Sequence, residues 1–423
     1  MKKNVLVFTV IWTSVLTHEL AAQTGWVFKD PMPTARAGIC AAVLDGRIYV
    51  MGGRDDSGKV LDLVERYDPV SDSWESLLPP LGKLGVAREN AAAVTLNGQV
   101  FVLGGRGQGA NGLDKVEFLN LAENKWEGFA DLVKEREALG AVVINGSIYA
   151  VGGGNGLLSL LFDDVEYYDQ VTHRWQTVNN WALRVATAEL VTVAVKDSAF
   201  AIGGASILGL LRFVQRYHTA LGVSLRADLL DARASAAGAV QGDSIFVLGG
   251  RGGLLGLETF DSVELYNAKT NRWANFAPLN TARQNFAAVA TNNSIYAIGG
   301  HDASGNVLSS VEAFELVTAV EDPVANVPEG FELWQNYPNP FNAGTKITYQ
   351  VPPHNRALQV RLVVYNLRGQ KVITLFQGLR LPGNYEVSWD GSDFQQQSLG
   401  SGIYIYTLEF DEHRISKKMI LSR

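Results

Sequence analysis

A frame of about fifty residues recurs six times between Trp26 and Val320, and this repetition restricts the possible fold more than any other feature. Each copy carries an Arg, a run of small apolar residues, a Gly-Gly pair and a stretch related to Val-Glu-x-aromatic, and usually a Trp after it. The Gly-Gly pairs lie at residues 52–53, 104–105, 152–153, 203–204, 249–250 and 299–300. Because one repeat of this size cannot bury its apolar face alone, the copies must stack on one another.

The first copy predicts four antiparallel strands. Residues 37–43 are small and apolar, as a tightly packed inner strand requires. Asp45 and Gly46 predict a two-residue hairpin turn, since both turn positions need positive φ, and residues 48–51 form the returning strand. Residues 63–67 and 74–77 predict a third and a fourth strand. Four such strands make one blade of a β-propeller.

Two copies depart from this frame. The fourth has Gln215 in place of Glu and Val223 in place of Trp, so we expect its blade to be the least well packed. The sixth has no Trp after Phe314, but Trp26 lies ten residues before Arg36, which is the Trp-to-Arg spacing of other copies. We infer that the N-terminal strand completes the last blade and closes the ring.

The diglycine pairs, the Glu-x-aromatic stretches and the Trp residues, recurring in register, resemble kelch repeats. Six of them resemble a six-bladed kelch β-propeller, which we place at residues 23–320. The resemblance implies an all-β fold for this part of the chain.

The N-terminus resembles an export signal. Lys2 and Lys3 precede an apolar run at 5–12, and Ala21-Ala22 predict cleavage after Ala22, so residues 1–22 are expected to be a signal peptide. The apolar run is too short to span a membrane well. No other apolar segment approaches this length, so we expect no transmembrane segment in the mature chain.

Composition restricts the classes of partner and of chemistry that we expect for this chain. The 423 residues are 47% hydrophobic and 19% charged, and the net charge of −7 comes without any basic block, which argues against a nucleic-acid partner. Cys40 is the single cysteine, so there is no disulfide framework. Its place on the predicted inner strand indicates a buried, inert thiol.

The repeats end before a short acidic, Pro-containing stretch at residues 321–330, which we interpret as a linker. Residues 331–423 show short alternating strands with glycine turns, and this pattern predicts a small Ig-like β-sandwich.

Five pieces of this sandwich resemble the C-terminal sorting domain of type IX secretion cargo, although Ala343 replaces a common Pro. They are residues 335–342, Tyr365-Asn366 with Gly369-Gln370, and residues 389–391, 401–404 and 417–419. The resemblance implies that the type IX machinery is a partner through residues 331–423. It also implies a secreted or cell-surface protein of a Gram-negative bacterium, often with later removal of the domain. The alternative is a generic Ig-like module that packs on the propeller.

Topology places two sets of basic residues on one face, around the mouth of the central channel. The residues that precede the inner strands are Arg36, Arg88, Arg136, Arg184, Arg233 and Arg283. The residues that follow Gly-Gly are Arg54, Arg106, Arg251 and His301. One interpretation is an anion-binding mouth, because guanidinium groups bind carboxylates in bidentate fashion. For the inner-strand arginines we favour structural pairing with a glutamate of the same blade (Glu65, Glu117, Glu166, Glu264 or Glu312), since buried charges are normally paired.

Three adjacent blades carry apolar loops on the same face. Their apolar residues are Leu157, Leu158, Leu160, Leu161, Phe162, Leu208, Leu210, Leu211, Leu254 and Leu255. An exposed apolar patch of this kind marks a partner site. The alternative is that the loops fold inward and plug the channel.

The sequence offers little for catalysis. Copper radical oxidases share kelch-type propellers, but they need a cross-linked Cys-Tyr pair and two His ligands. Cys40 is alone and the histidines are scattered, so we expect no metal and no cofactor. The main hypothesis is a non-enzymatic protein that binds a protein or glycan through the loop face. The alternative is a sugar-processing enzyme such as a sialate mutarotase, which needs an acid/base carboxylate and an Arg.

Overall fold

The computed structural model describes residues 25–75, 77–109, 111–156, 160–253, 255–291, 294–316, 331–351, 358–367, 369–395, 397–410 and 413–423. The expected signal peptide, the whole of the expected linker and the loop residues Leu157, Leu158 and Leu254 lie outside these ranges. Among the residues described, no helix is long and apolar enough to cross a membrane.

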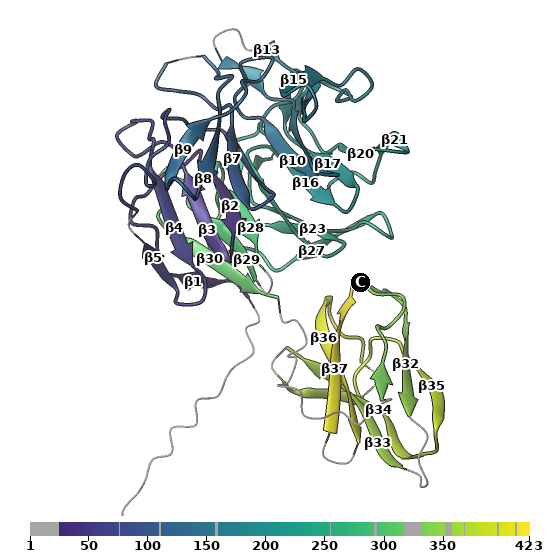
Figure 1. The fold of residues 1–423 in the computed structure, drawn as a ribbon. Helices are drawn as coiled ribbons and strands as arrows, with labels where there is room; N and C mark the ends of the chain where they lie inside the picture. The colour runs from purple at the N-terminus through teal and green to yellow at the C-terminus, as the bar shows by residue number, and fades with distance from the viewer. Residues whose placement is uncertain are drawn as a thin grey trace, which may run out of the picture.

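Within the described ranges, residues 25–316 form six four-stranded antiparallel sheets, arranged as blades around a central channel (Figure 1). The first blade contains β2 (Cys40–Leu44), β3 (Arg47–Met51), β4 (Val64–Asp68) and β5 (Ser73–Glu75). The second contains β6 (Ala92–Leu96), β7 (Gln99–Leu103), β8 (Val116–Asn120) and β9 (Lys125–Gly128). The third contains β10 (Gly140–Ile144), β11 (Ser147–Val151), β14 (Val165–Asp169) and β15 (Arg174–Thr177). The fourth blade contains β16 (Val191–Val195), β17 (Ser198–Ile202), β20 (Val214–His218) and β21 (Gly222–Leu225). The fifth contains β22 (Ala237–Gln241), β23 (Ser244–Leu248), β26 (Val263–Asn267) and β27 (Arg272–Phe276). The sixth contains β28 (Ala287–Ala290), β29 (Ser294–Ile298), β30 (Val311–Glu315) and β1 (Val27–Lys29).

The chain ends of the propeller meet in the sixth blade. β1 pairs antiparallel with β30, and Val27 lies opposite Ala313. Trp26 is buried next to it, with its ring 5.7 Å from that of Phe314 and its indole N–H 2.9 Å from the carbonyl oxygen of Ala277. The N-terminal strand therefore closes the ring through a ladder and a buried tryptophan.

In most blades, the tryptophan of the outer strand donates a hydrogen bond to the connection that leads in from the preceding blade. The indole N–H of Trp126 donates to Leu81 and that of Trp175 to Ala130, at 3.1 and 2.9 Å from the carbonyl oxygens. The fourth blade lacks this residue, but Trp181 from the preceding connection packs 5.5 Å from the ring of Tyr217 and is buried. The prediction of a poorly packed fourth blade did not allow for this replacement.

Residues 331–423 form an Ig-like sandwich, whose described strands make two sheets. Its strands are β31 (Glu332–Leu333), β32 (Thr345–Val351) and β35 (Gly383–Trp389) in one sheet, and β34 (Lys371–Arg380), β33 (Leu358–Asn366), β36 (Gly402–Phe410) and β37 (His413–Leu421) in the other. The core between them includes Tyr349, Tyr406 and Trp389.

The segment at 335–342 connects these two sheets. The amide of buried Asn336 donates to Thr345 Oγ1 at 2.9 Å, and its backbone N–H donates to the Tyr406 hydroxyl at 2.8 Å. Asn339 Oδ1 accepts the backbone N–H of Ile420 at 2.7 Å. The polar residues of this segment therefore hold the sandwich together.

Candidate functional site

Five of the inner-strand arginines do not line the mouth of the channel. Arg36, Arg88, Arg136, Arg233 and Arg283 are buried. Each pairs with the glutamate of its own blade, with N–O distances of 2.5–2.8 Å. Each guanidinium also donates to the carbonyl of the first glycine in its Gly-Gly pair, at 2.7–3.0 Å. The anion-binding interpretation is thus wrong for these five, because a guanidinium removed from water is held by its partners inside the blade.

Arg184, the remaining member of that set, does not occupy the position that the five buried arginines share, so the prediction is wrong for this residue. Arg184 is exposed and stacks over Phe213, whereas Thr187 holds the position of the buried arginines, since its carbonyl accepts the N–H of Gly153. The same blade has Gln215 in place of Glu, and its amide donates to the carbonyl of Ala182 at 2.6 Å. The fourth blade thus lacks both the buried arginine and the buried glutamate, so it contains neither charge without its partner.

A closed ring of backbone hydrogen bonds surrounds the channel in the described propeller. Its six members each have positive φ and each donate an N–H to the carbonyl of the equivalent residue in the preceding blade, at 2.7–3.0 Å. We call this the amide ring; its members are Gly38, Asn90, Ala138, Glu189, Ser235 and Asn285. Sequence reasoning missed the ring, although Gly and Asn at three of the positions are residues that tolerate positive φ.

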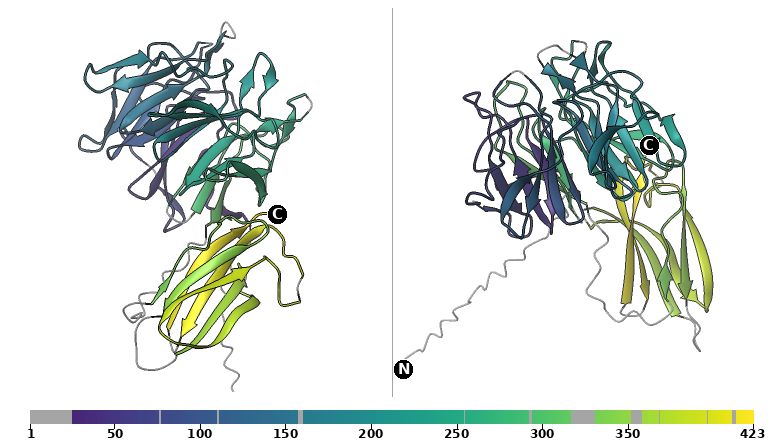
Figure 2. Two further views of the ribbon diagram at one scale, coloured as in Figure 1. Left: turned by 90° about the vertical axis from the view of Figure 1, so that its right-hand side faces the viewer. Right: turned by 45° about the horizontal axis from the view of Figure 1, so that its top comes forward.

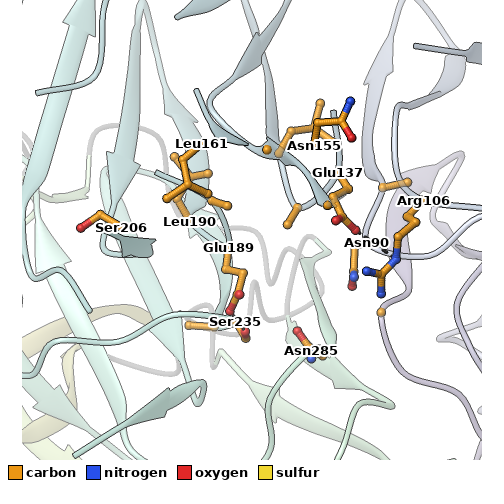
Figure 3. Close-up of a pocket in the computed structure, with 18 of the residues that line it drawn as sticks. Asn90, Arg106, Glu137, Asn155, Leu161, Glu189, Leu190, Ser206, Ser235 and Asn285 are labelled. Atoms are coloured by element: carbon orange, nitrogen blue, oxygen red, sulfur yellow. Dashed lines mark hydrogen bonds and ion pairs between the residues drawn. The ribbon is translucent and has the colours of Figure 1, made fainter. Parts of the chain in front are cut away.

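A cavity of about 880 Å³ opens above the amide ring (Figure 3). Its polar lining includes Arg106, Glu137 and Arg251 beside the ring residues, and its apolar lining includes Leu139, Leu160, Leu161, Leu190, Ile207 and Phe286. Figure 3 shows Glu137 and Arg106 on one side of the pocket and Glu189 and Leu190 on the other. The cavity volume lies within the ordinary range for ligand sites.

Of the arginines that follow Gly-Gly, Arg106 and Arg251 line this cavity, and all three, including Arg54, are paired with glutamates. Arg54 Nη2 and Arg106 Nη2 both donate to Glu89 Oε1, at 2.6 and 2.7 Å. Burial alone would raise the pKa of Glu89, but the hydrogen bonds from Arg54 and Arg106 outweigh it and leave that pKa below its ordinary value. Two guanidinium groups therefore share one carboxylate.

The other side of the mouth is also balanced in charge. Arg251 donates to both carboxylate oxygens of Glu189, at 3.0 and 3.1 Å, and Ser235 Oγ donates to the same group. Glu137 lies 3.2 Å from Arg106, but burial, together with the charges of Glu89 and Glu189, raises the pKa of Glu137. The mouth is a mixed polar surface, not a row of unpaired cations.

His301, the fourth of the residues that follow Gly-Gly, forms an antiparallel backbone β-bridge with Gln284. Burial lowers its pKa, so its imidazole is neutral at physiological pH. Within the described ranges, no group of three or more His, Cys, Asp or Glu side chains is arranged to hold a metal ion. Cys40 is buried, and burial raises the pKa of its thiol to about 12, so it is not a nucleophile at neutral pH.

Three short hairpins stand beside the cavity, one on each of the third, fourth and fifth blades. They are β12 (Gly154–Asn155) with β13 (Leu160–Leu161), β18 (Ala205–Ser206) with β19 (Gly209–Leu210), and β24 (Arg251–Gly252) with β25 (Glu258–Thr259). Their exposed side chains form what we call the aliphatic arc: Leu160, Ile207, Leu208, Leu255 and Leu257.

The tips of the aliphatic arc face water. Ile207 is 90% exposed and Leu257 is 82% exposed, so these tips do not plug the channel. Of the other predicted loop residues, Leu211 is buried, and Phe162 packs against the guanidinium of Arg136. Those two residues stabilise the blades instead of forming a surface.

Comparison with known proteins supports this architecture. Residues 8–204 match the KLHDC2/KLHL20/DRC7 Kelch-repeats domain, residues 232–280 and 282–319 match the Kelch motif, and residues 336–412 match the FlgD Ig-like domain. The solved structure of YjhT is similar to this chain, with a TM-score of 0.58 and 18% identity, over 67% of this chain and 96% of that one.

Curated relatives are similar over the propeller. Kelch-like protein 23 of Homo sapiens is 26% identical over 311 residues, which cover 72% of this chain and 44% of that protein. Kelch-like protein 40 of Xenopus tropicalis is 31% identical over 129 residues, which cover 30% of this chain and 20% of that protein. The chain spans less than half the length of these relatives. Its repeats are kelch repeats, and they form a kelch β-propeller that precedes an Ig-like β-sandwich.

Proposed function

We propose that this protein is a non-enzymatic binding protein whose propeller recognises a polypeptide through the channel mouth. One observation carries the proposal: the aliphatic arc stands beside the cavity, so apolar and polar recognition surfaces are continuous. A single sugar ring in the cavity would leave Leu208, Leu255 and Leu257, which do not line the cavity, in water. A polypeptide segment can fill the cavity and cover the arc together, and exposed apolar patches commonly mark such partner sites.

The test is a screen of the chain from Gln23 onward on peptide and glycan arrays, at low and at high salt. Because the mouth arginines are already paired, we expect peptide hits whose binding changes little with salt. The double variant Ile207→Asp/Leu257→Asp should lose these hits while keeping its melting temperature, because both side chains are exposed.

The matched control is Val70→Asp/Val171→Asp. These valines are 96% and 88% exposed and lie in turns on the opposite face, so this variant should keep the hits. Hits confined to glycans, or equal binding by both double variants, would contradict recognition of a polypeptide by the arc.

A sugar-processing function of the mutarotase type is a second candidate, and one observation favours it. The raised pKa of Glu137, beside Arg106 in the cavity, is what an acid/base carboxylate next to an anion-binding group requires. Anomerisation of a free sugar acid by the chain, abolished in Glu137→Gln, would support this alternative. No acceleration over the uncatalysed rate would remove it.

We also propose export through the type IX system, with residues 331–423 as the sorting domain, and hence a secreted or cell-surface location in a Gram-negative bacterium. The segments at 335–342 and 401–404 and the Ig-like fold support this proposal. Deletion of residues 331–423 should leave the protein in the periplasm, measured by cell fractionation. Normal surface delivery of the truncated chain would contradict the proposal.

A further inference from the structure

We propose that the Ig-like sandwich acts as a latch on the propeller: it packs on the place where the N-terminal strand closes the ring and keeps that strand docked. The inference concerns residues outside the channel mouth and does not depend on the ligand. We call this place the seam; it consists of Trp26, β1, β30 and Leu316.

Apolar contacts join the two parts of the chain at the seam. Leu367, Ile403 and Ile420 of the sandwich pack in the same cluster as Trp26, Phe314 and Leu316 of the propeller. Ile403 is buried although it stands at the end of its strand. Figures 1 and 2 show one end of the sandwich facing the propeller in each view.

The three sandwich residues belong to one end of that domain. Ile403 lies opposite Ile420 in the β36–β37 ladder, and Leu367 follows β33, whose last residue pairs with Tyr404. The contact therefore uses a single compact surface, formed where the last two strands of the chain begin and end.

The seam is the place in the ring that most needs such support. In the other blades, a turn of a few residues joins the third strand to the fourth, whereas β1 reaches its blade from the far end of the propeller sequence. β1 has three residues, and Val27 and Phe28 are exposed. Short strands with few buried contacts open locally at low free-energy cost, and the buried side chains that oppose opening here are Trp26 before β1 and Met32 after it.

Docking of the sandwich couples to this opening. If β1 leaves the blade, Trp26 leaves the cluster to which Ile403 and Ile420 also belong, so the apolar cluster shared by the two parts of the chain becomes smaller. The covalent connection keeps the sandwich at a high effective concentration near the seam, so even a small apolar contact is occupied. The docked sandwich consequently disfavours the open form of the ring.

Hydrogen exchange of the full chain tests the latch. In Ile403→Ser/Ile420→Ser, amide exchange in residues 26–30 should become roughly tenfold faster, while the other blades keep their protection. The control, Leu379→Ser/Leu381→Ser, changes two exposed residues of the same sandwich and should leave exchange in residues 26–30 unchanged. Equal exchange of this segment in the two variants would overturn the proposal.

A second measurement covers the case in which the serine variant unfolds the sandwich. A protease site placed between residues 321 and 330 allows the unchanged sandwich to be cut free and diluted away. Exchange in residues 26–30 should then accelerate, and an excess of the free sandwich should restore protection. Unchanged exchange after cutting and dilution would show that no latch exists.

Discussion

At the residue scale, the recurring Arg, Gly-Gly and Glu of five of the six copies are parts of one buried arrangement. A Cβ placed on Gly104 would lie 2.5 Å from the carbonyl oxygen of Arg136 in the next blade, and this glycine also has a φ of +57°. The close approach leaves no room for another residue. The same glycine's carbonyl accepts the Arg88 guanidinium, so the diglycine pair both ends a strand and receives a buried charge.

The buried pair of the third blade gives a first prediction. Arg136→Thr should destabilise the fold by about 3–5 kcal/mol, because it leaves the buried Glu166 carboxylate without its cation. Arg136→Thr/Glu166→Gln copies the fourth blade and should cost less than the single change. Denaturant unfolding measures both, and a double variant that is less stable than Arg136→Thr would contradict this account.

Glu89 and Glu137, the two carboxylates near Arg106, give a second prediction. Their effects on stability should change with pH in opposite directions. The lowered pKa of Glu89 means that its contribution to stability is present at neutral pH and is lost as pH falls through that lowered pKa. The raised pKa of Glu137 means that ionising it costs stability as pH rises toward neutrality.

Melting temperatures between about pH 3 and pH 8 test these signs. Glu89→Gln should be less stable than the parent at pH 7, with the difference shrinking in acid. Glu137→Gln should match the parent in acid and be at least as stable at neutral pH. A Glu137→Gln variant that loses stability only at neutral pH would show that the sign is wrong.

At the scale of elements, the strands and turns were predictable because each blade repeats its own local signals. The small inner strands and the two-residue turns at positive φ, such as Asp45-Gly46, are encoded within a few residues. The amide ring, the three hairpins and the shifted register at Thr187 were not predictable in this way. The amide ring and the position of Thr187 depend on contacts between blades, which no single copy of the frame displays. The three hairpins are local, but they lie in connections whose sequence is not shared by the six copies.

The fourth blade shows this dependence and gives a third prediction. Trp181 comes from the connection and not from the outer strand, so a frame aligned on the strand Trp could not find it. Trp181→Ala should destabilise the propeller by about 3–5 kcal/mol, as much as Trp175→Ala, because both rings are buried. Val223→Ala, at a partly exposed site, should change unfolding little in the same denaturant titration, and a larger effect there than at Trp181 would contradict the replacement.

At the scale of the whole molecule, the sequence predicted the number of repeats, the all-β fold and a separate C-terminal sandwich. It could not predict that the mouth arginines are neutralised, because the carboxylates are not part of the shared frame. The position of Glu89 and Glu137 holds Ala or Gln in the other four copies, and Glu189 is the one acidic member of the amide ring. The resulting molecule has an amphipathic mouth on one face and a sandwich docked at the ring's seam. The two proposals thus place ligand recognition and the support of ring closure on different surfaces.

Hydrogen-exchange footprinting of the chain with a peptide selected on the array tests the central claim most directly. We predict protection in residues 160–162, 206–210 and 255–260, and none in the turns around Val70 and Val171 on the opposite face. Protection of those opposite turns, with the three hairpins unchanged, would contradict recognition at the channel mouth.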